Sequence, residues 1–205
     1  MQVMIFQSTV GVPNMERVVH SVDTEALMEE IARLRGEVAQ LESRCDELDR
    51  LACHDVLVPV ANRRGLVRQL EMLIARQARH TAPASLLFID VDGLKWLNDS
   101  FGHAAGDAAL VHLAELMLRT VRQTDLVARL GGDEFAILLD HADGAAANLT
   151  AKRLVNTVAE SDFIHSGKPL PLSVAVGFTV IEKGDTAEAV LDRADQEMYR
   201  DKAAA

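Results

Sequence analysis

The chain has 205 residues, of which 49% are apolar, so it is long enough to bury the core of one domain and to carry one further element. Its formal net charge of −10 argues against a nucleic-acid partner, because no basic stripe is present to neutralise a phosphate backbone. No apolar run reaches the length of a transmembrane helix, and residues 1–10 lack the cationic start of a signal peptide. We therefore expect a cytoplasmic protein with no membrane partner.

Residues 1–22 show little pattern and are expected to form a short leader without regular structure. In residues 23–53 the apolar side chains recur at alternating spacings of four and three residues. One seam position holds Ile31, Val38, Cys45 and Ala52, and the other holds Leu27, Leu34, Leu41 and Leu48. β-Branched residues such as Ile31 and Val38 at the first position, with leucine at the second, favour a parallel two-stranded coiled coil, and thus a homodimer. The alternative is an amphipathic helix that packs on its own domain.

The charges beside the seam agree with a parallel coil in part. In such a pair they would attract at Glu30–Arg35 and Arg44–Asp49 and repel at Glu37–Glu42.

Residues 54–205 predict a single domain. Pro59 ends the first helix, and Asn62 is the expected N-cap of a second helix that runs to about Arg79. The continuous apolar run Ala84–Val91 predicts a strand buried on both faces, and two apolar runs around Gly131 predict a β-hairpin. The other expected elements are helices over residues 103–122, 144–160 and 187–202 and a strand over 170–181. This order predicts an α/β domain, a mixed α+β sheet with flanking helices, preceded by a long coiled-coil helix.

Carboxylates gather where two of these strands end. Asp90 and Asp92 close the apolar strand, at the edge where α/β sheets place their ligands. The hairpin carries a Gly-Gly pair ending at Gly132, whose backbone a phosphate can approach closely, followed at once by Asp133 and Glu134. Adjacent carboxylates repel each other and favour a divalent cation. If strand and hairpin converge, they predict a Mg²⁺ (or Mn²⁺) site that polarises a phosphoryl group; the alternative is a solvated strand end beside a polar turn.

The segment Arg129-Leu-Gly-Gly-Asp-Glu-Phe135 resembles the signature of the GGDEF family of diguanylate cyclases. Four further segments resemble motifs of that family in order and spacing: Asp90-Val-Asp-Gly-Leu-Lys-Trp-Leu-Asn98, Phe101-Gly-His-Ala-Ala-Gly-Asp107, Ser173-Val-Ala-Val-Gly177 and Ala194-Asp-Gln-Glu-Met-Tyr-Arg-Asp-Lys202. The resemblance covers about residues 53–205. It implies a nucleotidyl-cyclase-like fold and an enzyme that condenses two GTP molecules into cyclic di-GMP with release of two pyrophosphates.

The resemblance also implies a role for individual residues. Asp90, the carbonyl of Val91 and Asp133 would bind the metal, and Glu134 would be its second carboxylate or would activate the attacking hydroxyl. Asn98 and Asp107 would read the guanine edge. The terminal phosphates would be held by Gly93, Leu94, Lys95, Gly132 and Lys202.

The resemblance also implies that two domains pair during the reaction and that the product inhibits the enzyme. Each domain would bind one GTP, so two domains must meet, which gives the predicted homodimer a purpose. Arg122 and Asp125 resemble an inhibitory motif that binds the product, cyclic di-GMP.

The chain departs from the family at Val58-Pro59, where a threonine is usual, and at Leu94, where an aromatic residue is usual. The alternative reading is a catalytically weak domain that binds GTP or cyclic di-GMP and signals through its coil.

Overall fold

The computed structural model describes residues 24–77 and 82–204. The chain separates into two compact units, residues 1–46 and residues 47–205. The predicted leader, residues 1–22, lies outside the described residues, and the domain boundaries predicted at residues 22 and 53 stay predictions. Among the described helices none is both long and apolar enough to cross a membrane.

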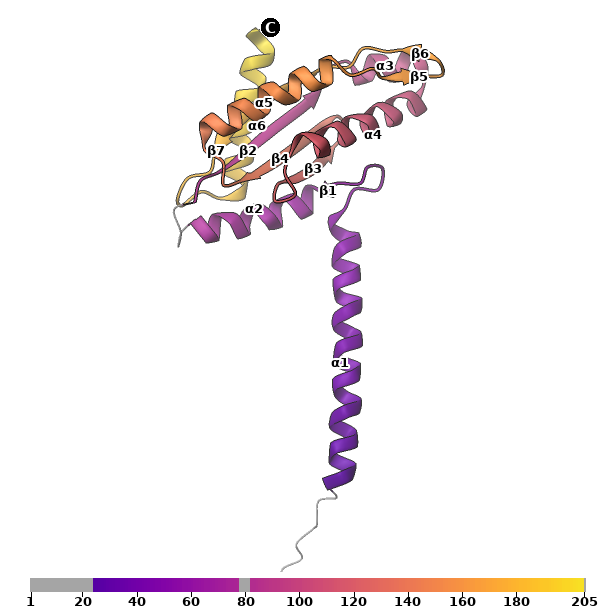
Figure 1. The fold of residues 1–205 in the computed structure, drawn as a ribbon, viewed down its shortest axis with the longest axis vertical. Coiled ribbons are helices and arrows are strands. Elements are labelled where there is room, and N and C mark those ends of the chain that lie inside the picture. Colours follow the sequence, from indigo (N-terminus) through magenta and orange to yellow (C-terminus); the bar gives the residue numbers. More distant parts are fainter. Residues whose placement is uncertain (1–23, 78–81, 205) are drawn as a thin grey trace, which may run out of the picture. The chain divides into compact units, whose positions relative to one another are not determined.

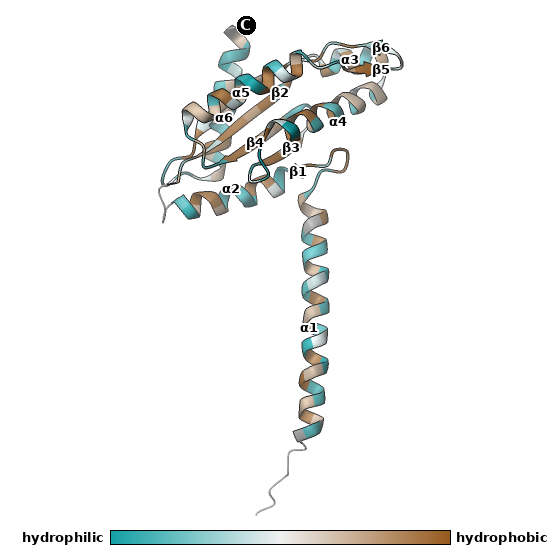
Figure 2. Cartoon of the chain, viewed as in Figure 1, coloured by the Kyte–Doolittle hydropathy of each residue, from teal (hydrophilic) through white to brown (hydrophobic). Residues whose placement is uncertain are grey.

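Helix α1 spans Thr24–Cys53 and is one continuous helix of 30 residues. The leucine, isoleucine and valine side chains of the predicted seam lie on its surface, with exposed fractions from 39% for Ile31 to 65% for Leu48. Cys45 is exposed as well, and Ala52, at the end of the seam, is half-buried. Figure 2 shows brown and teal residues interleaved along α1. Arg33 pairs with Glu30 at 2.6 Å and also with Glu37, which stabilises the helix within a single chain.

The domain that follows is built on a five-stranded sheet in the order β1-β3-β4-β2-β7 (Figure 1). The strands are β1 Ala61–Asn62, β2 Ala84–Val91, β3 Leu126–Gly131, β4 Glu134–Asp140 and β7 Val174–Val180. β1 pairs with β3 in parallel, and the other pairs are antiparallel. A separate short ladder joins β5 Ile164–His165 to β6 Lys168–Pro169. The mixed sheet confirms the predicted fold class.

Five helices flank the sheet: α2 Arg63–Gln77, α3 Leu94–Phe101, α4 His103–Thr120, α5 Gly144–Ala159 and α6 Ala187–Ala204. One core cluster joins alternate residues of β2, such as Leu87 and Ile89, to α3, α4 and α5. The other joins Leu86 and Phe88 of β2 to α2 and α6. β2 is therefore covered on both faces, which explains why its sequence is continuously apolar.

Close packing of α6 on the sheet depends on Gly177 of β7. A Cβ added there would lie 2.0 Å from the backbone nitrogen of Met198, so that only a glycine allows the helix backbone to come this near the strand. The glycine inside the predicted strand therefore marks a close approach of backbones. It fixes the position of α6, whose last turn carries Lys202.

Several predicted bounds need correction. Asn62 caps α2 as expected, because its Oδ1 accepts the N–H of Gly65 at 3.0 Å. The helix expected over 103–122 ends at Thr120, and the strand expected over 170–181 covers only Val174–Val180. Helix α3 and the two-residue strands β1, β5 and β6 were not predicted at all.

Candidate active site

The C-terminal end of β2 and the tip of the β3–β4 hairpin lie side by side. Asp90 is opposite Glu134 in the β2–β4 ladder. The next residue, Val91, donates its N–H to the backbone oxygen of Asp133 at 3.0 Å. The structure therefore brings together the four residues predicted for metal binding, from segments more than 40 positions apart in the sequence.

The Gly-Gly turn is held in place by Arg129. Its Nε and Nη2 donate to the backbone oxygen of Gly132 at 3.1 and 2.7 Å, and Gly132 has φ 52°, a conformation that glycine adopts readily. The same guanidinium donates to Oδ1 of Asp55 at 3.3 Å, and both side chains are largely buried, 14% and 16% exposed. Arg129 thus ties the turn to the loop that follows α1. The sequence indicated Arg129 only as part of the signature, without a role of its own.

Asp55 is held ionised by its surroundings. Burial opposes its ionisation, but the N–H groups of Leu57 and Val58, at 2.9 and 3.0 Å, and the charge of Arg129 together keep the pKa of its carboxyl below the ordinary value. The Asp55 carboxylate therefore binds the backbone of the same loop in which Val58 and Pro59 depart from the pattern that the resemblance implies.

Negative charge accumulates at the hairpin tip. Partial burial raises the pKa of the Glu134 carboxyl above its ordinary value. The charges of Asp133, Asp195 and Asp90 raise it further, while Arg63 acts in the opposite direction. Asp195, from α6, is a member of this acidic group that the sequence did not point to. The carboxylates repel one another, as the sequence predicted for a site that favours a cation.

A cation of the protein itself contacts this group. Nζ of Lys202 lies 2.5 Å from Oδ1 of Asp90 and 3.5 Å from Oδ1 of Asp92. The hydrogen bond to Asp90 is the main reason why the pKa of Lys202 is raised. Asp92 is fixed further, because Ser173 donates its hydroxyl to it at 2.9 Å.

The donor set suits Mg²⁺, which prefers carboxylate and carbonyl oxygens. However, no group of three or more His, Cys, Asp or Glu side chains in residues 24–77 and 82–204 is arranged to hold a metal ion. Mg²⁺ is commonly bound by one or two carboxylates together with substrate phosphates, and a site of that kind needs no closed protein cage. The residues present therefore fit a metal that shares its ligands with a nucleotide.

Helices α3 and α4 hold the residues predicted to read a base. Gly93, with φ 68°, turns the chain from β2 into α3, and Leu94 is 8% exposed, so its side chain belongs to the core and only its backbone is available. Asn98 is half-buried against Gly106 of α4, where an added Cβ would lie 2.0 Å from Oδ1 of Asn98. Asp107 follows on the surface, as does Lys95 on α3.

The predicted inhibitory motif lies in the turn between α4 and β3, and Asp125 is eight residues before Asp133 in the sequence. The Asp125 carboxylate accepts the N–H groups of Arg122 at 2.9 Å and Asp140 at 3.2 Å. Arg122 itself is exposed. Both line a cavity of roughly 280 Å³ together with Arg153 of α5, which the sequence did not single out. The cavity therefore offers two guanidinium groups and two carboxylates, those of Asp125 and Asp140.

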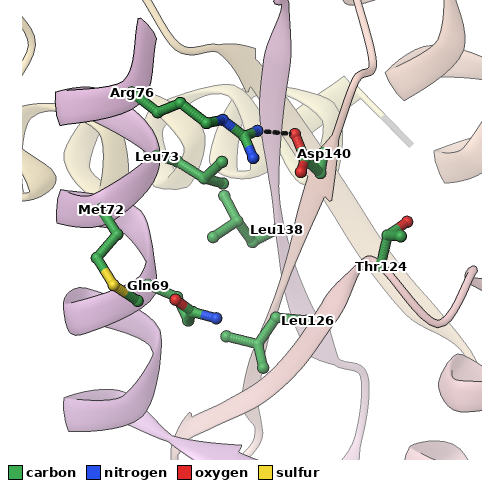
Figure 3. Close-up of a pocket in the computed structure, with 8 residues that line it drawn as sticks. All are labelled: Gln69, Met72, Leu73, Arg76, Thr124, Leu126, Leu138 and Asp140. Carbon is green, nitrogen blue, oxygen red and sulfur yellow. Dashed lines mark hydrogen bonds and ion pairs between the residues drawn. The ribbon is translucent and has the colours of Figure 1, made fainter.

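A second cavity, of roughly 270 Å³, lies between α2 and the hairpin strands. Figure 3 shows its aliphatic wall, which includes Leu73, Leu126 and Leu138, and an ion pair between Arg76 and Asp140 at its end. Asp140 lines both cavities. The pair holds the end of α2 against the strand β4.

Comparison with known proteins identifies the family. Residues 52–205 match the model of the diguanylate cyclase GGDEF domain. The chain is 35% identical to diguanylate cyclase DgcP of Pseudomonas aeruginosa over 180 residues, which are 88% of this chain and 27% of DgcP. It is 36% identical to response regulator PleD of Caulobacter vibrioides over 166 residues, 80% of this chain and 37% of PleD. The chain therefore belongs to the GGDEF family, and it spans less than half the length of these relatives.

Solved structures agree with this assignment. Diguanylate cyclase SiaD of Pseudomonas aeruginosa, solved with its activator SiaC, superposes with a TM-score of 0.71 at 30% identity over 88% of this chain and 72% of that one. The coiled coil and GGDEF domain of DgcB from Caulobacter crescentus, solved with cyclic di-GMP, gives a TM-score of 0.75 at 24% identity over 87% of this chain and 95% of that one, which shows the shared fold.

Proposed function

We propose that this chain is a diguanylate cyclase that condenses two GTP molecules into cyclic di-GMP and releases two pyrophosphates. The observation that carries the proposal is the convergence of β2 and the Gly-Gly turn, with Asp90 opposite Glu134 and Val91 bonded to Asp133. Sequence relatives that are diguanylate cyclases support it. In the reaction the 3′-hydroxyl of one GTP attacks the α-phosphorus of the other, twice, and each attack expels one pyrophosphate.

In this proposal the acidic residues at the end of β2 hold the reacting phosphates through a cation. Asp90, the carbonyl of Val91 and Asp133 would bind Mg²⁺ or Mn²⁺, which when bound neutralises phosphate charge. Glu134 would either share that cation or accept the proton of the attacking hydroxyl. Its raised pKa makes it a stronger base than an ordinary carboxylate, which suits the second role.

The other contacts to GTP would come from α3, α4 and α6. Asn98 and Asp107 offer an amide and a carboxylate, which match the acceptor at O6 and the donors at N1 and N2 of guanine. The backbone of Gly93 and Leu94 opens α3, where N–H groups favour a phosphate. Lys95 and Lys202 add positive charge, and Gly132 allows close approach at the turn.

One domain of this kind binds one GTP, so the reaction requires a second copy. The exposed seam of α1 supplies a reason for two chains to pair, since an aliphatic side chain moved from water into an interface gains on the order of 1.5–3 kcal/mol. The Arg33–Glu37 pair within each helix also offsets the repulsion expected between Glu37 and Glu42 of opposite chains. We therefore propose a parallel homodimer through α1.

Product inhibition is proposed for the cavity lined by Arg122, Asp125 and Arg153. Guanidinium groups bind phosphates and guanine acceptors through paired hydrogen bonds, and cyclic di-GMP carries both. The Asp125 carboxylate already accepts two backbone N–H groups, so its first role is to fix the turn that presents Arg122.

The test is to incubate the purified protein with GTP and Mg²⁺ and to separate the nucleotides. Wild type should form cyclic di-GMP, and Asp133→Asn should form at least a hundredfold less, because the variant keeps the backbone bond to Val91 but loses its charge. Asp162→Asn, at an exposed aspartate between α5 and β5, is the matched control and should match wild type. Wild type that binds GTP without forming product would favour the receptor reading instead.

A further inference from the structure

The contact between Lys202 and Asp90 joins the last turn of α6 to the end of β2, 112 positions away in the sequence. Asp90 is only 19% exposed, and among the ion pairs of the described residues its partner is Lys202. The ammonium also lies 3.5 Å from Asp92. Lys202 therefore occupies an oxygen of the carboxylate that the proposed metal would use.

The nearby arginines do not replace Lys202 in this position. The guanidinium of Arg129 is committed to Gly132 and Asp55. Arg63 influences Glu134 electrostatically but makes no ion pair with it within 4.0 Å. In the absence of a metal, Lys202 is thus the cation that directly neutralises the end of β2.

An ammonium and a divalent cation that share one carboxylate repel each other, so each weakens the binding of the other. A metal ion that arrives alone has to bind against the charge of Lys202 or displace Lys202 from Asp90. When a nucleotide arrives with the metal, its phosphates offer the ammonium a new anionic partner. The exchange therefore favours joint binding of metal and nucleotide over binding of either alone.

We infer that Lys202 is the counter-ion of the metal-free site, and that its transfer from Asp90 to nucleotide phosphates couples metal binding to nucleotide binding. The inference rests on the proposed metal and GTP site. Coupling of this kind is reciprocal, so the nucleotide strengthens metal binding by the same factor by which the metal strengthens nucleotide binding. Lys202 acts here as a positioning residue whose effect on the metal passes through Asp90.

The experiment measures Mn²⁺ binding by electron paramagnetic resonance, first without nucleotide and then with 3′-deoxy-GTP, which lacks the attacking hydroxyl and so cannot react. Lys202→Met should bind Mn²⁺ alone about fivefold more tightly than wild type, which corresponds to about 1 kcal/mol for a partly exposed ion pair. The increase in Mn²⁺ affinity caused by 3′-deoxy-GTP should be smaller by a similar factor in Lys202→Met. Lys202→Arg should behave like wild type.

Arg200→Met is the matched control, because Arg200 lies in the same turn of α6 but pairs with Glu197. If it tightened Mn²⁺ binding as much as Lys202→Met, the effect would be one of general charge and the inference would be wrong. Equal affinities of wild type and Lys202→Met, with weakened binding by Asp90→Asn, would overturn the inference but leave the proposed metal site standing. Unchanged binding by Asp90→Asn would overturn both.

Discussion

Asn98 shows how a single side chain at the proposed base site depends on the residue that it packs against. Its amide lies against Gly106 on the first turns of α4, and there is no room for a methyl group between them. The amide is the flexible end of the side chain, so an added Cβ would push it aside without opening the core. The glycine therefore sets where the amide points, and this links one backbone position to base recognition.

We predict that Gly106→Ala weakens GTP binding by roughly tenfold or more, because an unmet hydrogen bond to a buried base edge costs on the order of 1–3 kcal/mol. The thermal unfolding midpoint should change little, since alanine also raises helix propensity. Gly144→Ala is the matched control: its Cβ would meet Val180 at an ordinary 3.4 Å, and it should bind GTP as wild type does. Calorimetric titration with 3′-deoxy-GTP checks this, and equal affinity in both variants would contradict it.

Asp185 predicts a pH dependence of stability. The hydrogen bonds from Arg193, and then the N–H of Glu182, hold the pKa of its carboxyl below the ordinary value. Arg193 also bonds Thr179 and the carbonyl of Val180, so the pair fastens α6 to the edge strand β7. An acid whose pKa is depressed by folding stabilises the protein above its unfolded pKa, and this contribution is lost as the pH falls through the folded pKa.

Asp185→Asn should therefore lower the free energy of unfolding by about 1 kcal/mol at pH 7, a value reduced for the partial exposure of Arg193. The difference from wild type should shrink as the pH falls below about 4. Urea unfolding at pH 7, 5 and 3.5 measures it. A difference that stayed constant across this range would show that the charge of Asp185 contributes nothing.

At the scale of elements, the strands that carry the site are well specified by the sequence. The apolar run of β2 predicted its bounds, because burial on both faces removes polar residues from the whole strand. The two runs of β3 and β4 predicted the hairpin. Short elements left no such signal. Helix α3 has only eight residues, between Gly93 and Gly102, and no side-chain cap, so no pattern in the sequence marked it as a helix.

The strand β7 was predicted too long for a related reason. Leu170 and Leu172 are buried, so the sequence is apolar there, but Pro169 and Pro171 lack the N–H groups that a ladder requires. The N–H of Leu170 bonds the backbone oxygen of Phe163 at 2.9 Å instead of a strand of the main sheet. Burial outside that ladder looks like a strand in the sequence. Apolar pattern alone therefore overestimates strand length wherever prolines interrupt it.

For the candidate site, the sequence pointed to the residues at strand ends but missed the contacts that depend on how distant elements pack. The sequence indicated carboxylates at the end of β2 and on the hairpin turn, and it left open whether the two converge, which depends on the pairing of β2 with β4. The contact of Lys202 with Asp90 depends on how α6 packs over Gly177, and local periodicity does not encode a tertiary contact across 112 positions. Arg153 was missed because it lies on a separate helix, and only the fold brings it beside Arg122.

The turn between α4 and β3 is an element whose role is testable by itself. If cyclic di-GMP binds in the cavity beside it, Arg122→Ala should raise the inhibitory product concentration about ten- to a hundredfold, from the loss of a charge-assisted contact of about 1.5–3 kcal/mol. Arg153→Ala should act in the same direction. Uninhibited initial rates should be preserved, because neither residue contacts the acidic group at β2.

Initial rates at increasing cyclic di-GMP, with wild type and both variants side by side, provide the measurement. Arg119→Ala, on the last turn of α4, is the matched control because its partner Glu115 lies on the same helix. Equal inhibition of wild type and Arg122→Ala would show that this turn is only a solvated helix end.

At the scale of the whole molecule, α1 and the domain have separate requirements that dimerisation would satisfy together. Within the described part of the chain the aliphatic seam of α1 is largely exposed, and in the proposed reaction a domain that binds one GTP needs a second GTP beside it. Pairing through the helix raises the effective concentration of one domain near the other without any new contact at the site. The loop held by Asp55 and Arg129 follows α1 directly in the chain, so it is where such pairing would be transmitted.

Charges introduced into the seam test this arrangement. Leu34→Asp combined with Leu41→Asp would place four carboxylates in the apolar interface of a dimer, and burying unpaired charges costs far more than the seam gains from burial. The variant should sediment as a monomer and lose most cyclase activity, while each domain still binds 3′-deoxy-GTP, because neither leucine belongs to the domain core. Gln40→Asp combined with Ser43→Asp adds the same charge to exposed positions of α1 outside the seam, and it should remain an active dimer.

Cys45 provides an independent measure of the coil, because its predicted seam position faces its own copy in a parallel, in-register pair. Mild oxidation should link wild-type chains through Cys45 and leave the double leucine variant unlinked, and Cys45→Ser should abolish the link. A double leucine variant that sediments as a monomer yet keeps full activity would show that the domains pair without the helix.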